Sequence, residues 1–334
     1  MVSYPSYDNN KMANKVDSDY YYSYIDGNAS YPAMNRPTQQ VTAPGSTFKM
    51  VTATAALEEG YVSIGDTIKD KVTFKAISPS PHCWSSVSHG NINVAQAIEM
   101  SCNYFFYEIG YEMGNGNKKY VNDKKGLSIL KKYAKMYGLL DKSGVELPEV
   151  EPNYSTKDIV RSAIGQGSHN YTPAQLSRYV TTIANNGTCY DLTLIQSVKD
   201  INGKTILKNK ANVHNKVELD ISTWNAIHTG MYNVVNGKDS TIGDLFDQKK
   251  LKQKVAGKTG TPQESDYKAN HAAFVSYAPY NNPDISVTCV IPNGHTSSNA
   301  AETARDVYKY YFSKDKKIPT KVTAPELDSA SFSD

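Results

Sequence analysis

The spacing of apolar residues changes along the chain, from helical repeats in the middle to strict alternation toward the C-terminal end. Apolar residues three or four positions apart predict helices at about residues 93–100, 104–113, 124–137, 173–186 and 221–235. An Ala-rich run that begins after Pro44 and Gly45 and stops at Gly60 predicts a further helix, with Ser46 at its start. The last third predicts strands at 254–261, 271–279 and 284–292, followed by an amphipathic helix at about 299–312.

The last two predicted strands are separated only by the turn sequence YNNP. Strands joined by such a short turn pair antiparallel, and the helix that follows needs an apolar face to pack against. We therefore predict an α+β fold in which helices cover an antiparallel sheet. The predicted helices within about residues 61–160 indicate an all-helical subdomain inserted in this fold.

Two other segments differ from this pattern. Residues 67–74 alternate and predict a strand, but its apolar face, with Ile68, Val72 and Phe74, also carries Asp70. An unpaired carboxylate there is costly, so we expect a partner for its charge. Residues 1–43 are rich in Pro, Asn, Ser and Tyr without a sustained repeat, and they predict an irregular segment.

The composition excludes several classes of protein. The 36 Lys and Arg residues nearly balance the 33 Asp and Glu residues, and the net charge of +3 is spread without a dense basic cluster, which argues against a nucleic-acid partner. No stretch approaches the roughly 18 apolar residues of a membrane-spanning helix, and the first residues lack the regions of a signal peptide. Four cysteines in 334 residues are too few for a disulfide scaffold.

The segment STFK places a lysine amine near a serine hydroxyl. Lys49 follows Ser46 by one helical turn, so the two side chains share a helix face. A serine hydroxyl is a weak nucleophile, and a lysine can take its proton only if burial or another cation lowers the pKa of the amine. Ser46 and Lys49 are therefore a candidate nucleophile and base.

Two further motifs supply the groups that such a nucleophile needs. SCN lies between two predicted helices, where a tight turn would direct Ser101 and Asn103 into a cleft. KTGT lies on the predicted strand 254–261 and offers a second amine, two hydroxyls and a glycine that would let a substrate backbone approach: Lys258, Thr259, Gly260 and Thr261. Each motif alone is common by chance. In this order, S-x-x-K, S-x-N and K-T-G form a known serine acyl-transfer set.

With these motifs the sequence resembles the transpeptidase domain of class B, monofunctional penicillin-binding proteins, in particular the rod-elongation type. The resemblance covers most of residues 1–312 and is carried by SYPSYDNN, NRPTQQVTAPGSTFK, HGNINVAQAIEMSCNYFFYEIGYEMG, IGQGSHNYTPAQLSRYVTTIANNGT and AFVSYAPYNNPDISVTCVI. It implies the fold shared by penicillin-binding proteins and serine β-lactamases over residues 1–334. It also implies that the family's first sheet strand, pedestal domain and membrane anchor belong upstream of residue 1, so we expect this chain to lack them.

The resemblance implies a role for each residue of the first two motifs. Ser46 would attack the penultimate D-Ala carbonyl of a peptidoglycan stem peptide, or a β-lactam, and Lys49 would relay its proton. Ser101 would pass the proton to the leaving amine, and Asn103 would hold the substrate amide.

The third motif is expected to bind the substrate. Lys258, Thr259 and Thr261 would hold the terminal carboxylate, and Lys258 would also tune Lys49. The backbone N–H groups of Ser46 and Thr261 would form the oxyanion hole, in which one donor is typically worth about 10²–10³ in rate. A peptide that lies along residues 258–261 as an added strand would place the substrate.

The sequence between the second and third motifs bears on the fate of the acyl-enzyme. A class A β-lactamase needs a carboxylate-activated water, and no E-x-x-L-N pattern is present to supply it. The acyl-enzyme is therefore expected to persist until an amine arrives, which favours a D,D-transpeptidase. A β-lactam sensor domain and a D,D-carboxypeptidase are the alternatives, and none of these reactions requires a cofactor.

The resemblance also implies a location and partners. The domain would work on the extracytoplasmic face of a bacterial membrane, on stem peptides and β-lactams. In the full-length protein its expected partner is a membrane glycosyltransferase of the shape, elongation, division and sporulation type.

Asp70, Cys83, His89 and Cys102 are a candidate structural zinc site. Thiolate and imidazole ligands suit zinc, and a metal would neutralise Asp70 on its apolar face. Some elongation-type penicillin-binding proteins have such a site beside the active site, and the spacing here resembles theirs. Asp66 is a rival ligand, although in IGDT it is more typical of a turn residue, and His82 is expected to point away. A Cys83 to Cys102 disulfide, or simple packing of the thiols, are the alternatives.

Overall fold

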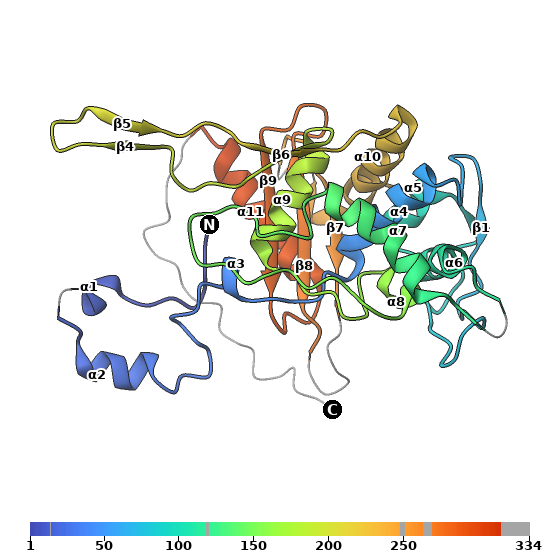
Figure 1. Ribbon diagram of the computed structural model, residues 1–334, viewed down its shortest axis with the longest axis horizontal. Helices are drawn as coiled ribbons and strands as arrows, with labels where there is room; N and C mark the ends of the chain where they lie inside the picture. Colours follow the sequence, from blue (N-terminus) through green and yellow to red (C-terminus); the bar gives the residue numbers. More distant parts are fainter. Residues whose placement is uncertain (14, 118–119, 248–250, 263–268, 315–334) are drawn as a thin grey trace.

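The computed structural model describes residues 1–13, 15–117, 120–247, 251–262 and 269–314. A three-stranded antiparallel sheet lies at its centre, in the order β7, β8, β9 (Figure 1). Its strands are Ala256–Gly260, Ala272–Ala278 and Ile285–Ile291. These bounds confirm the three predicted strands, and the covering helices confirm the α+β fold.

The helices predicted from apolar spacing are all present. They are α4 (Lys49–Glu58), α5 (Val94–Glu99), α6 (Asn103–Met113), α7 (Asp123–Met136), α9 (Pro173–Ala184), α10 (Ile221–Asn236) and α11 (Ser297–Phe312). Capping boxes begin two of them, because Asn93 and Thr172 each exchange hydrogen bonds with a glutamine three residues later. Two shorter helices, α8 (Ile159–Ser162) and the 3-10 helix η3 (Gly243–Phe246), complete the body.

The side chains of β8 show that helices cover both faces of the sheet. Ser276 accepts a hydrogen bond from Tyr308 of α11 (2.8 Å), so Tyr277 points to the other face. Tyr277 pairs with Ser286 of β9, whose hydroxyl shares a hydrogen bond with Thr181 of α9 (2.7 Å). α9 and α11 therefore pack on opposite faces, which explains why β8 is buried along its whole length.

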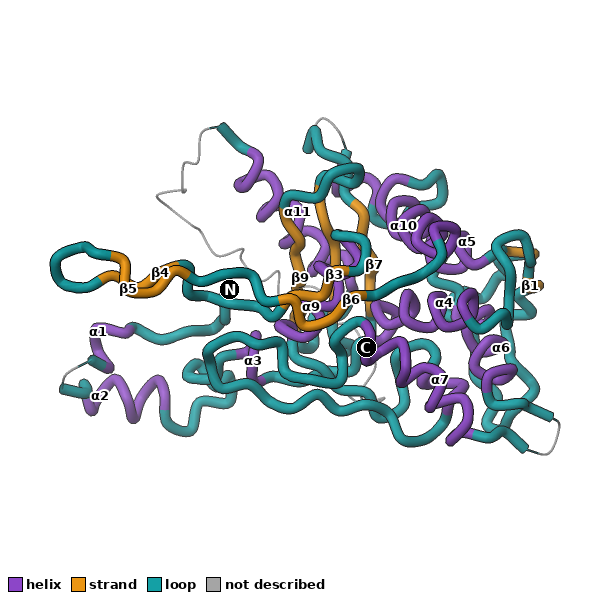
Figure 2. Tube along the Cα trace, turned by 45° about the horizontal axis from the view of Figure 1, so that its top comes forward, coloured by secondary structure: helices purple, strands orange, loops and turns teal. Residues whose placement is uncertain are grey.

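The helices α4 to α7 gather on one side of the sheet, together with α10 (Figures 1 and 2). α4 packs on α6 and α7, and α6 packs on α8. Residues 61–160 contain α5, α6, α7 and the start of α8, but also long irregular segments and the two-stranded pair β1 (Ile68–Lys69) and β2 (Asn91–Ile92). The prediction of an all-helical subdomain is therefore wrong for the segments between these helices. None of the helices in the described ranges combines the length and the apolar character needed to cross a membrane.

The strand predicted at residues 67–74 is wrong beyond its first part. Only Ile68 and Lys69 pair with β2. The chain then turns because the Asp70 carboxylate accepts a hydrogen bond from the N–H of Val72 (2.7 Å), and Val72 itself has a φ of 65°. Asp70 therefore does not lie on an apolar strand face, but at the buried start of a loop.

Two regions extend away from the sheet on the side opposite the helical region (Figures 1 and 2). The N-terminal segment is irregular, as predicted, apart from short turns of helix: α1 (Asn9–Met12), α2 (Ser18–Tyr20), the π-helix η1 (Tyr21–Ile25) and α3 (Arg36–Gln39). The connection from α9 to α10 forms two antiparallel pairs, β3 (Thr188–Tyr190) with β6 (Val213–Lys216) and β4 (Ser197–Lys199) with β5 (Thr205–Lys208).

Candidate active site

Ser46 lies in the 3-10 turn η2 (Gly45–Phe48), which runs directly into α4. Two contacts with residues 165–169 hold this turn in place. The N–H of Gly45 donates to Gly165 O (3.0 Å), and the buried ring of Phe48 packs on that of His169 at 4.5 Å between centroids. Ser46 itself is half-buried. The predicted position of Ser46 at the start of a helix is confirmed.

Lys49 is the first residue of α4 and is fully buried. Its amine donates to the carbonyl oxygen of Ser101 (2.7 Å), to Ser101 Oγ (3.2 Å) and to Asn103 Oδ1 (2.7 Å). Burial lowers the pKa of Lys49 from 10.5 to about 8, because the charged ammonium loses its hydration there. Part of the Lys49 population is therefore neutral near pH 7 and can accept a proton.

Ser101 occupies the expected tight turn between α5 and α6. Its φ of 52° is in the left-handed region, which is uncommon for a residue other than glycine and occurs often at functional sites. Asn103 begins α6, and the intervening Cys102 caps that helix by accepting a hydrogen bond from the N–H of Phe105 (3.5 Å). Both polar side chains of the SCN motif thus reach Lys49, while Cys102 is directed elsewhere.

Lys258 extends from β7 to the same serine hydroxyl. It is fully buried, and its amine donates to Ser101 Oγ (2.9 Å) and to Thr259 O (3.2 Å). Burial, and then repulsion from Lys49, hold the pKa of Lys258 well below its usual value. Ser101 Oγ is therefore in contact with two amines that resist being charged together. We call Lys49, Ser101, Asn103 and Lys258 the amine cluster.

Gly260 has a different role from the one expected. A Cβ atom at Gly260 would lie 2.9 Å from Thr47 Cγ2 and 3.0 Å from Pro44 O, so the place of its missing side chain faces the turn that carries Ser46. Glycine at this position lets β7 pack closely on that turn, rather than giving a substrate backbone room to approach.

A cleft of about 1380 Å³ opens over these groups. Ser46, Ser101, Asn103, Thr259 and Thr261 line it. Residues from all three motifs, distant in sequence, therefore meet at one hollow in the surface.

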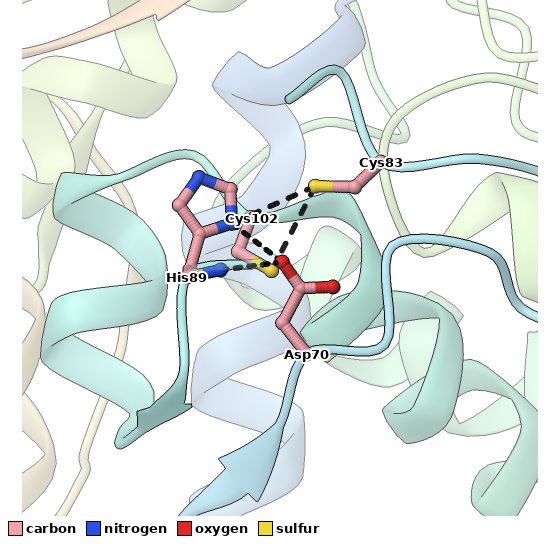
Figure 3. A group of neighbouring side chains, drawn as sticks. All are labelled: Asp70, Cys83, His89 and Cys102. Atoms are coloured by element: carbon pink, nitrogen blue, oxygen red, sulfur yellow. Dashed lines mark hydrogen bonds and ion pairs between the residues drawn. The ribbon is translucent and has the colours of Figure 1, made fainter. Parts of the chain in front are cut away.

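A second polar cluster lies on the other side of the SCN segment (Figure 3). It consists of the four predicted metal ligands Asp70, Cys83, His89 and Cys102, and we call it the thiol cluster. Their ligand atoms all lie within 4.8 Å of one another. His89 Nδ1 is 2.8 Å from Asp70 Oδ2 and 3.8 Å from Cys83 Sγ, and the two sulfur atoms are 3.9 Å apart.

The donor set of the thiol cluster fits a zinc ion. Tetrahedral coordination with Zn–S bonds of about 2.3 Å separates two sulfur ligands by about 3.8 Å, close to the separation of Cys83 and Cys102 here. At 3.9 Å the two thiols are not bonded to each other. Two thiols, an imidazole and a carboxylate are all zinc ligands, and four of them together would leave no open position for catalysis.

Hydrogen bonds favour the ionised forms of Asp70 and of one of the two thiols, Cys83. Although burial raises it, the N–H groups of His89 (3.0 Å) and Val72 hold the pKa of Asp70 below its usual value. The hydrogen bond between the thiols lowers the pKa of Cys83 to about 5 and raises that of Cys102, because one proton serves both sulfur atoms.

The rival residues lie outside the thiol cluster. Asp66 accepts a hydrogen bond from the N–H of Ser63 (2.8 Å) and forms the turn that IGDT indicated. His82 Nδ1 shares a hydrogen bond with Thr73 Oγ1 (3.0 Å) and lines the cleft instead. Both expectations are confirmed.

The sequence analysis missed three residues near the cleft. Gly165 accepts the hydrogen bond from Gly45 that holds the turn carrying Ser46, and the pair of glycines in IGQGS is the one local signal of a special backbone there. Arg161 lines the cleft and donates to Pro79 O (2.7 Å), fastening the loop that carries Cys83. Trp84 lines the cleft with its side chain 59% exposed. Nothing in the sequence indicated Arg161 or Trp84.

The fold and the three converging motifs define a serine acyl-transferase of the penicillin-binding type. The chain belongs to the family described as penicillin binding protein transpeptidase domain, which matches residues 1–309. Among curated proteins it is similar to the peptidoglycan D,D-transpeptidase MrdA of Haemophilus influenzae, with 30% identity over 94% of this chain and 51% of that protein. Penicillin-binding protein 2B of Streptococcus pneumoniae is also 30% identical, over 81% of this chain and 43% of that protein. The chain therefore spans about half the length of these class B relatives.

Solved structures agree with this assignment. Pseudomonas aeruginosa PBP2 in complex with WCK 5153 superposes with a TM-score of 0.79 over 96% of this chain and 72% of that chain, at 24% identity, a similarity of fold. Penicillin-binding protein 2B from Streptococcus pneumoniae strain R6 gives a TM-score of 0.72 at 28% identity, over 83% of this chain and 48% of that chain.

Proposed function

We propose that the chain is the D,D-transpeptidase domain of an elongation-type penicillin-binding protein, which cross-links peptidoglycan stem peptides through an acyl-enzyme on Ser46. The observation that carries this proposal is the contact of two buried amines, Lys49 and Lys258, with Ser101 Oγ. A buried amine with a lowered pKa is a base for a serine hydroxyl, and a second one beside it keeps both from being protonated together.

Acylation uses the amine cluster as a proton path. Neutral Lys49 takes the proton of Ser46 while Ser46 Oγ attacks the penultimate D-Ala carbonyl. Ser101, hydrogen-bonded to Lys49, passes a proton to the nitrogen of the departing D-Ala. Asn103 Oδ1 is bound to Lys49 in the free enzyme, so its side-chain NH₂ group is directed away from that amine and is available for a substrate carbonyl.

Substrate binding uses the β7 motif. Thr259 and Thr261 line the cleft beside Ser46 and offer hydroxyl donors to the terminal carboxylate, with Lys258 behind them. The backbone N–H groups of Ser46 and Thr261 are the proposed oxyanion hole. Because no carboxylate of the E-x-x-L-N type is present in the sequence, the acyl-enzyme waits for an acceptor amine.

Mass spectrometry after exposure to penicillin tests the acylation step. We expect one adduct, on the peptide that contains Ser46, and no adduct on the Ser46→Ala variant. An adduct elsewhere, or none on the wild-type protein, would contradict the proposal.

Product analysis with a stem-peptide donor and an amine acceptor separates this function from its alternatives. A cross-linked product is expected for a transpeptidase. Release of D-Ala without cross-linking would indicate a D,D-carboxypeptidase. Acylation by penicillin without any transfer would indicate a β-lactam sensor.

The proposal includes a structural zinc ion held by Asp70, Cys83, His89 and Cys102. With four protein ligands the ion would neutralise the thiolates and the carboxylate, and it would supply no catalytic water. Cys102 lies between Ser101 and Asn103 in the chain, so the site would fix the turn that carries both.

Metal analysis of protein purified without added zinc tests this part of the proposal. We expect about one zinc per chain and a lower melting temperature after chelation. A chain without metal whose melting is unchanged by chelator would contradict it. Titration of free thiols distinguishes the two alternatives, because a Cys83 to Cys102 disulfide removes two thiols and simple packing removes none.

The proposed location and partner follow from the same function. Stem peptides are cross-linked outside the cytoplasm, which places the domain on the extracytoplasmic face of a bacterial membrane. Solved relatives include a PBP2 complex with MreC from Helicobacter pylori and a peptidoglycan synthase complex that couples polymerisation with cross-linking. A membrane glycosyltransferase is the proposed partner of the full-length protein, tested by co-purification.

A further inference from the structure

The hairpin of β4 and β5 extends from the body of the protein as an arm, which we define as residues 194–210 (Figure 1). Every residue of both strands is exposed. Six large apolar side chains of the arm are between 38% and 100% exposed and lie outside the hydrophobic core of the described residues: Leu194, Ile195, Val198, Ile201, Ile206 and Leu207. A lone two-stranded hairpin gains little stability from such side chains, whereas an exposed apolar patch of this kind typically marks an interaction surface.

Hydrogen bonds at the base and at the tip order the arm. At the base the side chain of Asn209 donates to Ile195 O (2.9 Å) across the hairpin. At the tip the Asp200 carboxylate accepts from the N–H of Lys204 (2.9 Å), and the turn that this closes leaves Ile201 fully exposed. Because the arm is already ordered, its residues lose little conformational entropy when they bind a partner.

The register of the hairpin separates apolar from polar side chains. Val198 pairs with Leu207, and Ser197 pairs with Lys208. Paired residues project from the same face of a hairpin, and successive residues project from opposite faces. Val198 and Leu207 therefore share one face, and Ser197 and Lys208 share the other, so the arm is amphipathic.

The charges of the arm are mainly positive. It carries the four lysines Lys199, Lys204, Lys208 and Lys210 but only one acidic residue, Asp200, whose carboxylate accepts hydrogen bonds from the backbone of the tip. Four lysines against one aspartate give the arm a net charge of +3, the same as that of the whole chain, so the charges of the remaining residues balance. An anionic surface would therefore attract the arm.

The composition of the arm distinguishes between classes of partner. Its sequence, LIQSVKDINGKTILKNK, contains no aromatic residue, methionine or arginine, the residues in which protein interfaces are enriched, and it is rich in lysine, in which they are depleted. A soluble polyanion would bind the lysines but leave the apolar face in water. An anionic lipid surface offers phosphates to the lysines and an apolar layer to Ile201, and the long lysine stems allow both contacts at once.

We propose that the β4–β5 arm binds the surface of a membrane that contains anionic phospholipid. Ile201 and the face with Val198 and Leu207 enter the headgroup region, and the lysines contact lipid phosphates. A net charge of +3 and a few aliphatic side chains give weak, reversible binding. Such binding would orient a domain that is already held at a membrane. The chemistry at Ser46 plays no part in it.

Flotation of the whole chain with lipid vesicles tests the arm. The wild-type protein should bind vesicles of mixed phosphatidylglycerol and phosphatidylcholine more strongly than vesicles of phosphatidylcholine alone, and added salt should weaken the difference. The double variant Lys199→Gln, Lys208→Gln should lower the partition coefficient on the anionic vesicles about 25-fold, because each lysine near an anionic surface is worth about fivefold. Ile201→Ser should lower it about tenfold through the lost aliphatic group.

Matched changes elsewhere on the surface are the controls. Lys131→Gln with Lys135→Gln removes the same charge from exposed positions of α7. Ile221→Ser replaces an isoleucine that is 79% exposed at the start of α10. Both controls should leave the partition coefficient nearly unchanged, because screening confines the attraction to lysines close to the lipid.

Three results would overturn the membrane contact. The first is equal binding of the wild type to both kinds of vesicle, or arm variants that bind like the wild type. The second is an equal loss in the α7 control, which would show that net charge alone attracts the protein. The third is unchanged vesicle binding by arm variants that lose self-association or co-purification with the proposed glycosyltransferase, since the arm would then bind protein.

Acylation by penicillin separates this contact from the proposed function. The arm variants should keep the wild-type acylation rate, because none of the described residues that line the cleft belongs to the arm. Arm-dependent vesicle binding by a chain that penicillin does not acylate would support the membrane contact and refute the proposed function.

Discussion

The amine cluster and the thiol cluster share one short segment of chain but differ in what holds them in place. Ser101 and Asn103 turn toward Lys49 and Lys258, whereas Cys102 between them turns toward the other cluster. The amines stand on α4 and β7, which the sheet and the helical core fix. The thiol cluster draws three of its four residues, Asp70, Cys83 and His89, from the irregular chain between β1 and β2.

The two clusters therefore differ in what stabilises them. Hydrophobic burial of α4 and β7 stabilises the amine cluster, and the same burial lowers the pKa values of its lysines. In the thiol cluster only Cys102 adjoins a helix, so we expect the proposed metal to supply part of the order of this cluster. The clusters should therefore respond differently to changes in side chains, backbone, pH and metal.

The largest separation is expected from Lys49→Met, which keeps an unbranched side chain one atom shorter than lysine but removes the base. Acylation of Ser46 by penicillin should fall by about 10³-fold, in the middle of the range for general-base catalysis. The metal content of the variant should not change, because the hydrogen bonds described for Lys49 lead to Ser101 and Asn103 and not to the thiol cluster. Stopped-flow acylation and metal analysis of the same preparation measure both. Acylation within tenfold of wild type would rule out Lys49 as the base.

A backbone change at Gly165 should also damage the amine cluster alone. Gly165 has a φ of 76°, and a Cβ there would overlap the carbonyl oxygen of Gly45 and lie 2.8 Å from Phe48 Cβ. Gly165→Ala should lower the free energy of unfolding by about 1–3 kcal/mol through strain and overpacking, and slow acylation about 30-fold by moving Ser46.

Gly60→Ala is the matched control for this backbone change. Gly60 has a similar φ of 72° but no atom within 4 Å of an added Cβ. It should show the loss of about 1 kcal/mol expected for a left-handed alanine, with acylation unchanged. Equal acylation rates for Gly165→Ala and Gly60→Ala would show that the contact between Gly165 and the turn η2 does not position Ser46.

The pH dependence should follow Lys49, whose pKa is lowered to about 8. Below that pH the amine is protonated and cannot act as a base, so the acylation rate should fall by close to tenfold per pH unit and level off above pH 8. The native protein binds fewer protons than the unfolded chain between about 8 and 10.5, so its free energy of unfolding should rise with pH in that window. A rate that is flat from pH 6 to 9 would contradict the role of Lys49.

The sequence predicted the amine cluster better than the structure around the thiol cluster. STFK, SCN and KTGT lie at ends of regular elements, which apolar spacing and capping residues locate well. The strand predicted through Asp70 failed because a local hydrogen bond to Val72 outcompeted the alternating pattern, and periodicity does not register such turns. The contact between Gly45 and Gly165 depends on tertiary packing across the chain, so no local pattern contains it. The exposed pairs β3 with β6 and β4 with β5 carry few buried residues and left no apolar repeat to detect.

The smallest effect on chemistry is expected from Cys83→Ser, which removes a ligand but, in the hydrogen bonds described, contacts neither Lys49 nor Lys258. A serine oxygen is a poor zinc ligand, so metal should be lost and the melting temperature should fall by several degrees. Acylation should slow by only about threefold to tenfold, because α4 and β7 keep both amines in place and only the SCN turn loosens. The half-buried Cys289 of β9 provides the control, since Cys289→Ser also replaces a thiol but lies outside the cluster and should keep its metal. If Cys83→Ser instead slowed acylation as much as Lys49→Met does, the thiol cluster would help to build the catalytic geometry. The two clusters would then not differ in what stabilises them, the packed fold for the amine cluster and the bound metal for the thiol cluster.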